Sequence, residues 1–178
     1  VGLLCGGPPC QPWSMSGRKK GAADPRDVMG FTPTAIAACE PEVFLFENVP
    51  GLLMSKEHQS YVADLFERMS KPKEGLKYGF AVVVVNAADY GVPQTRKRVL
   101  MLGIKGKSNT FANRLLRKIG EVTTHHNPMK PAIGKLPWVT LREAFKGIPE
   151  TEPWKQWNAT EETLKRLEIE IATEEENL

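Results

Sequence analysis

The sequence predicts an α/β domain with an open, largely parallel sheet covered by helices. Short apolar segments rich in β-branched residues alternate with segments of helical periodicity, which is typical of such sheets. About a dozen residues separate the last two expected strands, too few for a covering helix, so that pair is expected to be antiparallel. The expected strands are 1–7, 42–46, 78–86 and 99–104.

The elements follow from local patterns along the chain. Residues 1–7 form an apolar run that ends in glycine and proline, which predicts a buried strand that stops abruptly. Residues 8–27 are rich in Gly, Pro and basic residues and predict a long loop, which in a compact domain is usually functional or disordered. Apolar residues at helical spacing predict an amphipathic helix over 58–71. The remaining expectations are helices at 32–39, 111–119, 141–145 and 160–173 and a loop at 123–138.

Composition is ordinary for a globular protein. The chain has 178 residues, 41% of them hydrophobic and 25% charged, which suits one domain or one domain with an appendage. No apolar run is long enough to span a bilayer. Three cysteines suit a reducing cytosol and exclude a disulfide framework, and their spacing does not predict a metal site. We therefore expect a cytoplasmic protein.

Charge is divided unevenly along the chain. Residues 1–130 hold 18 Lys and Arg against 11 Asp and Glu, whereas residues 131–178 hold 6 against 10. Basic clusters at 18–20 and 96–98 lie in the positive part. Such clusters suit a polyanion such as nucleic acid, although a solvated basic face has the same composition.

Cys10 is the first residue with a chemical pattern. It follows a strand directly and lies in the stiff sequence Pro-Pro-Cys-Gln-Pro, where a substrate can reach it. A thiol reacts as its thiolate, which nearby backbone N–H groups and basic residues such as Arg18 would favour. Cys5 and Cys39 instead fit buried structural roles.

Two further polar clusters lie beside strand ends. Glu47 and Asn48 follow the strand 42–46, where a partly desolvated carboxylate can hold or donate a proton. Arg96 and Arg98 enter the strand 99–104, and their i, i+2 spacing turns both guanidinium groups the same way, toward phosphate or carbonyl oxygens. In open α/β sheets, ligands gather at the carboxyl ends of strands.

In order and spacing, these clusters resemble the Pro-Cys-Gln, Glu-Asn-Val and Gln-x-Arg-x-Arg motifs of the C5-cytosine-specific DNA methyltransferases. The resemblance covers the loop 14–26 and the approach 90–94 as well. It implies a partial Rossmann-like methyltransferase sheet flanked by helices, followed by the irregular start of a target-recognition region. The implied domains are a catalytic part at 1–106 and a linker with the start of that region at 107–178.

The resemblance also implies a mechanism. Cys10 attacks C6 of a cytosine flipped out of double-stranded DNA, and Glu47 engages N3 and the exocyclic amine. Arg98 and Arg96 hold the O2 oxygen and a neighbouring phosphate, while S-adenosylmethionine donates the methyl group to C5. The other implied residues are Gly7, Pro9 and Met29 for the cofactor, Ser14, Gly17, Arg18, Arg26 and Gln94 for DNA, and Asn48 as structural support.

The chain departs from this family in its cofactor motifs. The glycine-containing strand–helix turn that precedes the Cys motif has no counterpart here, and the C-terminal motif is absent. We expect the isolated chain to be a weak or inactive catalyst that a missing N-terminal segment or a second subunit completes. The alternatives are a non-catalytic nucleic-acid-binding or regulatory module of the same fold, and methylation of RNA cytosine.

Overall fold

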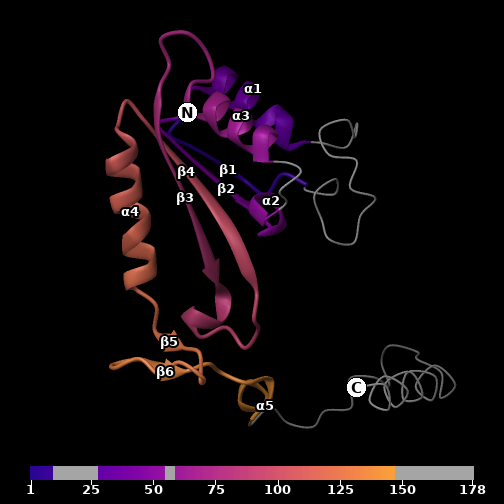
Figure 1. The fold of residues 1–178 in the computed structure, drawn as a ribbon, viewed down its shortest axis with the longest axis vertical. Coiled ribbons are helices and arrows are strands. Elements are labelled where there is room, and N and C mark those ends of the chain that lie inside the picture. The colour runs from indigo at the N-terminus through magenta and orange to yellow at the C-terminus, as the bar shows by residue number, and fades with distance from the viewer. Residues whose placement is uncertain (10–27, 55–58, 147–178) are drawn as a thin grey trace, which may run out of the picture. The chain divides into compact units, whose positions relative to one another are not determined.

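The computed structural model describes residues 1–9, 28–54 and 59–146. The chain divides into two compact units, Val1–Ala144 and Phe145–Leu178, and nearly all of the second lies outside the described residues, as does the helix expected at 160–173. The elements of the first unit (Figure 1) are β1 (Leu3–Gly6), η3 (Met29–Phe31), α1 (Thr32–Cys39), β2 (Val43–Asn48), α2 (Gly51–Met54), α3 (Gln59–Ser70), β3 (Tyr78–Asn86), η5 (Ala87–Tyr90), β4 (Lys97–Lys105), α4 (Asn109–Glu121), β5 (His125–His126), β6 (Leu136–Pro137) and α5 (Leu141–Ala144).

Four strands form the main sheet, in the order β1-β2-β4-β3. The α/β class is confirmed, and so is the antiparallel pairing of β3 with β4. The expectation of a largely parallel sheet was wrong for this part of the chain. Only β1 and β2 are parallel, because β4 inserts between β2 and β3 and runs antiparallel to both.

Helices cover the two faces of the sheet unequally. On one face, α1 and α3 pack over a core that contains Phe44, Val99 and Met101, all fully buried. On the other face, α4 buries Ala112 and Leu116 against β3 and β4 (Figure 1). The predicted helices 58–71 and 111–119 correspond to α3 and α4, and their apolar spacing matches the faces that they bury.

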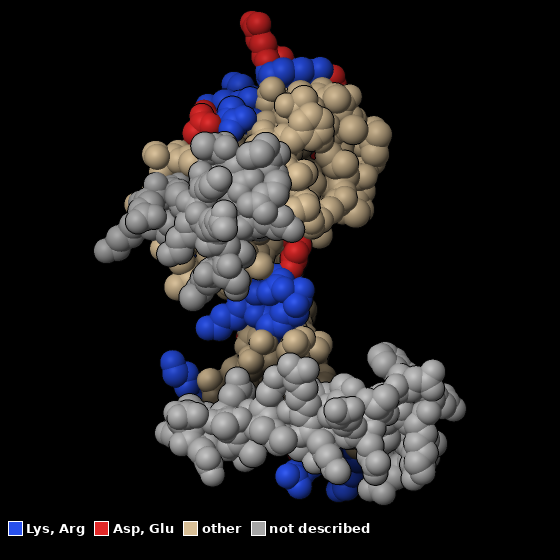
Figure 2. Space-filling model, turned by 90° about the vertical axis from the view of Figure 1, so that its right-hand side faces the viewer, with Lys and Arg blue, Asp and Glu red and all other residues tan. Residues whose placement is uncertain are grey.

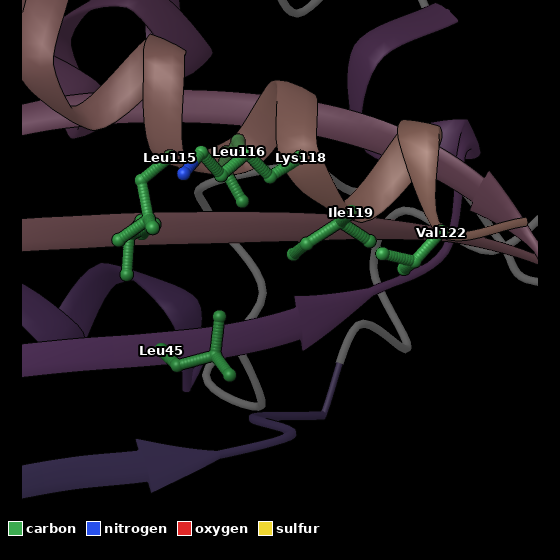
Figure 3. Close-up of a pocket in the computed structure, with 7 residues that line it drawn as sticks. Leu45, Leu115, Leu116, Lys118, Ile119 and Val122 are labelled. Atoms are coloured by element: carbon green, nitrogen blue, oxygen red, sulfur yellow. The ribbon is translucent and has the colours of Figure 1, made fainter.

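An apolar groove remains beside α4. It has a volume of about 350 Å³ and runs between α4 and the sheet, where Figure 3 shows α4 side chains over Leu45 of β2. The groove exists because α4 lies over β3 and β4 and leaves β2 partly uncovered. Its lining residues are Leu45, Leu102, Leu115, Leu116, Lys118, Ile119 and Val122.

β1 corrects the expectation of a buried first strand. Leu3 is 56% exposed and Cys5 is also exposed, whereas Leu4 packs against the core. Cys5 is therefore not the buried residue that the sequence predicted. The reason is that Leu3 and Cys5 lie on the α4 face of the sheet, and α4 packs on β3 and β4, whereas β1 is the edge strand on the far side of β2.

The segment after α4 holds more structure than the predicted loop. Two short strands, β5 and β6, pair in parallel at His125–His126 and Leu136–Pro137. No helix in the described ranges is both long and apolar enough to cross a membrane.

Candidate active site at the end of β2

Two neighbouring side chains leave the end of β2 on opposite faces. Asn48 is 3% exposed and shares the face of Phe44 and Phe46, and Glu47 faces the α4 side, because consecutive strand residues alternate. The Glu47 side chain is 41% exposed, so the partial desolvation expected from the sequence is slight.

Glu47 forms an ion pair with Arg98. The Nε of Arg98 contacts Oε1 of Glu47, and the Arg98 side chain is 22% exposed. The strand register explains the contact: Glu47 lies opposite Leu100, so Arg98 is its diagonal neighbour on the same face of an antiparallel pair. Arg98 also donates from Nη1 to the carbonyl oxygen of Lys97, at 2.8 Å. The guanidinium is thus held at the carboxylate from a different strand.

Asn48 connects the end of β2 to the loop that leads to Cys10. Its Nδ2 donates to the carbonyl oxygen of Pro8 at 3.3 Å, and its Oδ1 accepts from the backbone N–H of Val49 at 2.8 Å. Both polar atoms of the buried amide are therefore satisfied. Cys10 lies outside the described residues, but the carbonyl group of Pro8, two positions before it, is held at the end of β2 by Asn48.

Gly7 lies close to the same carboxylate. A Cβ built on Gly7 would be 3.3 Å from Oε2 of Glu47, which is tighter than an ordinary contact. A side chain at this position would press on the carboxylate. Glycine therefore lets the backbone after β1 lie close to the Glu47 carboxylate.

The turn from η5 into β4 is closed by a residue that the sequence reasoning missed. The Oδ1 of Asn86 accepts from the backbone N–H of Arg96 at 2.9 Å and from that of Ala88 at 3.5 Å. The backbone N–H of Ala87 also donates to the carbonyl oxygen of Arg96, at 3.0 Å. An Asn at a strand end before a turn is a known signal for such capping. It fixes the backbone that carries Arg96.

The structure brings some of the predicted site residues together and not others. Glu47, Arg98, Asn48 and Gly7 come together at the end of β2, whereas Arg96 and Gln94 are exposed at the adjoining turn. Met29 is fully buried in the core, and Pro9 is exposed. Five predicted residues lie outside the described ranges, namely Cys10, Ser14, Gly17, Arg18 and Arg26.

Basic side chains gather near this site. Figure 2 shows Lys and Arg grouped across the middle of the face seen there, beside an acidic patch. Arg96 and Lys97 are exposed at the start of β4. A positive surface next to the Glu47–Arg98 pair suits a polyanionic ligand. Within the described residues, no group of three or more His, Cys, Asp or Glu side chains could hold a metal ion.

The fold and this strand-end site define an α/β methyltransferase domain. A solved structure described as a DNA modification methyltransferase encoded within an E. coli prophage matches 85% of this chain and 36% of its own, with a TM-score of 0.52 and 26% identity. The chain belongs to the C-5 cytosine-specific DNA methylase family, whose family model matches residues 1–177.

Curated relatives agree with this assignment. The type II methyltransferase M.MthTI of Methanothermobacter thermautotrophicus is 35% identical over 157 residues, which is 86% of this chain and 40% of the relative. The type II methyltransferase M.AplI of Arthrospira platensis is 39% identical over 100 residues, 56% of this chain and 27% of the relative. The chain thus spans about a quarter to two-fifths of these relatives.

Substituting Asn48 with Asp is expected to destabilise the fold by about 1–3 kcal/mol at pH 8. The carboxylate cannot donate to Pro8, although it can still accept from Val49. When it is protonated, an Asp at this position can donate to Pro8. Burial raises the pKa of a carboxyl group, so the loss of stability should become smaller as the pH falls through that pKa.

Urea unfolding of both proteins at pH 8 and pH 5 measures this difference. The matched control is Asn113→Asp, because Asn113 is exposed and donates to the carbonyl oxygen of Asn109 within α4. It should change stability little at either pH. An equal loss for both variants would contradict the assigned role of Asn48.

Proposed function

We propose that this chain carries the catalytic centre for transfer of a methyl group from S-adenosylmethionine to C5 of cytosine in double-stranded DNA. The observation that carries the proposal is the Glu47–Arg98 ion pair, with Asn48 tied to Pro8 beside it. These contacts join parts of three motifs at one strand end. Because the relatives are type II methyltransferases, we further propose a role in restriction–modification.

Each residue has a defined task in this reaction. The Cys10 thiolate forms a bond to C6 of the flipped base, and Glu47 holds N3 and the exocyclic amine so that charge does not build on the ring. Arg98 steadies Glu47 and the O2 oxygen, and Arg96 meets a phosphate. When bound, S-adenosylmethionine would supply the methyl group for C5 and would leave as S-adenosylhomocysteine. Loss of the C5 proton to a base and departure of the thiolate from C6 then restore the ring.

The cofactor pocket is the part that this chain supplies least. Among the described residues, Gly7 leaves space beside Glu47 and Pro9 is exposed, which fits one wall of a pocket. Met29 is buried in the core and would shape that wall from behind. We propose that a further segment or subunit of the methyltransferase completes the pocket. The exposed outer edge of β1 supports this, since its backbone groups can pair with another strand.

DNA is the proposed partner of the exposed basic residues. We assign Gln94 and Arg96 at the η5–β4 turn, together with Ser14, Gly17, Arg18 and Arg26, to contacts with the duplex. Lys and Arg contacts to phosphates make binding depend steeply on salt.

The test is covalent trapping on a duplex that contains 5-fluorocytosine, with S-adenosylmethionine present. Fluorine at C5 cannot leave as a proton does, so a competent site stays bonded to the base through Cys10. We expect an adduct that survives denaturant when the segment that completes the enzyme is present. The adduct is detected by the shift of the protein on a denaturing gel.

Two matched variants show which cysteine forms the adduct. Cys10→Ser should abolish the adduct, whereas Cys5→Ser should keep it, because Cys5 is an exposed thiol on β1 with no proposed role. An RNA duplex of the same sequence should give no adduct. No adduct from the completed enzyme on DNA would refute the catalytic proposal and leave a nucleic-acid-binding module.

A further inference from the structure

Asp89 in η5 holds both short strands that follow α4. Its carboxylate Oδ1 accepts from the indole Nε1–H of Trp138 at 2.8 Å, and its backbone carbonyl oxygen accepts from the N–H of Thr124 at 3.0 Å. Thr124 precedes β5 and Trp138 follows β6. One residue of the turn therefore fixes both strands.

His125 adds a tight contact to the same turn. Gly91 lies in the left-handed region at φ 85°, and a Cβ there would be 2.7 Å from Cε1 of the His125 ring. Glycine is needed for both reasons, because any side chain would be strained and would displace the imidazole. The imidazole Nδ1 also shares a hydrogen bond of 2.8 Å with the hydroxyl of Thr124.

The two strands form one unit with each other. The N–H of Leu136 donates to the carbonyl oxygen of Thr124, and the N–H of Trp138 donates to that of His126, both at 3.0 Å. A displacement of Trp138 therefore moves β5 as well as β6. We call Asp89, Gly91, Thr124, His125 and Trp138 the Asp89 clasp.

The turn that contains Asp89 and Gly91 also leads to the two arginines of the site. The carbonyl oxygen of Asp89 accepts from Thr124, and seven residues later the backbone N–H of Arg96 donates to the Asn86 side chain at 2.9 Å. Arg98, two positions further, contacts Glu47. The strands β5 and β6 are thus connected to the Glu47 carboxylate through residues 89–98, which these hydrogen bonds hold in place.

We propose that the Asp89 clasp is a positioning device, which sets the segment after α4 against the η5–β4 turn that carries Arg96, so that base recognition and chemistry occur on the same nucleotide. This inference rests on the proposed function and on the expectation, from the family resemblance, that residues 107–178 contain the start of the region that reads the target. Asp89 and Trp138 are positioning residues, because they act through the segment and not on the reacting atoms. Loosening them lowers discrimination between DNA sequences without weakening binding of the methyl donor.

The experiment uses the active methyltransferase that contains this chain and a preferred duplex selected by binding from a random library. Asp89→Ala and Trp138→Phe each remove the hydrogen bond between the carboxylate and the indole. We expect each to reduce the preference for that duplex over one with a single changed base pair by about ten-fold, in binding and in kcat/KM for DNA. The KM for S-adenosylmethionine should change less than about two-fold, since Gly7 follows β1 and Asp89 follows β3, the two opposite edge strands of the sheet.

Three controls separate this role from general damage. Asp89→Asn keeps an oxygen acceptor and should retain the preference. The double variant Asp89→Ala with Trp138→Phe should lose no more of the sequence preference than either single variant, because both substitutions remove the same hydrogen bond. Tyr78→Phe removes a buried hydrogen bond of 2.8 Å to the carbonyl oxygen of Pro41, at the start of β3, and should leave the preference unchanged.

The outcomes are distinct for the two proposals. Undiminished sequence preference in both Asp89→Ala and Trp138→Phe would overturn the clasp, as would an equal loss in Asp89→Asn or Tyr78→Phe. If the unsubstituted enzyme methylates no cytosine, the proposed function fails. The binding preference still tests the clasp in that case, because it needs no turnover.

Discussion

Replacing Glu47 with Gln is expected to lower kcat for cytosine methylation by about 10²–10⁴-fold, the range for loss of a positioned acid–base group. The amide has nearly the same shape, but it carries no charge and cannot supply a proton to N3 of the ring. It also loses the charge-assisted contact with Arg98, so the guanidinium is no longer fixed at the strand end. Methyl incorporation measured under single-turnover conditions isolates this step.

Glu42→Gln is the matched control. Glu42 lies just before β2, its side chain is 72% exposed, and its ion pair with Lys105 is long, at 3.9 Å. This substitution removes the same charge from the other end of the strand, and the rate should remain within about two-fold, because exposed pairs contribute little. If Glu47→Gln kept its rate, Glu47 would have no catalytic role and the pair with Arg98 would be structural.

Gly103→Ala is expected to destabilise the first unit by about 3 kcal/mol, at the upper end of the usual cost of overpacking. Gly103 pairs with Phe44 across β4 and β2, and a Cβ there would be 2.1 Å from the Phe44 ring. That ring is fully buried, and its centroid is 5.2 Å from that of Tyr78, so it has no free space to enter. Burial also raises the pKa of Tyr78 to about 12, which agrees with a dry and closely packed region.

Gly120→Ala makes the same chemical change at a position where it is expected to increase stability. Gly120 lies in α4, and a Cβ there meets nothing within 4 Å. Alanine should stabilise the helix by up to about 1 kcal/mol, through its higher helix propensity. The two variants are compared by their urea midpoints. A stable Gly103→Ala protein would mean that Phe44 has another rotamer available.

The sequence predicted the parts of the fold that local patterns determine. Apolar spacing predicted α3 and α4, and the short connection between β3 and β4 predicted their antiparallel pairing. Strand order could not be predicted in this way, because no local sequence pattern indicates that β4 lies next to β2. The exposure of Leu3 was missed for a related reason: an apolar run looks the same in an edge strand as in a central one.

The site shows the same division. Glu47 and Arg98 were recognised by their positions at strand ends, and the ion pair between them follows from a register that only the folded sheet supplies. Asp89 and Trp138 were overlooked, since they are 49 residues apart and neither belongs to a recognisable pattern. Asn86 had a local signal, an amide at a strand end, that could have been used.

The edge position of β1 has a consequence for handling the chain at high concentration. Within the described residues β1 pairs with β2 alone, and the side chain of Leu3 is 56% exposed. An edge strand of this kind can pair with the same edge of another copy, which is a common route to aggregation. Because such pairing involves two copies, it increases with concentration, and dilution during refolding should favour the correctly folded chain.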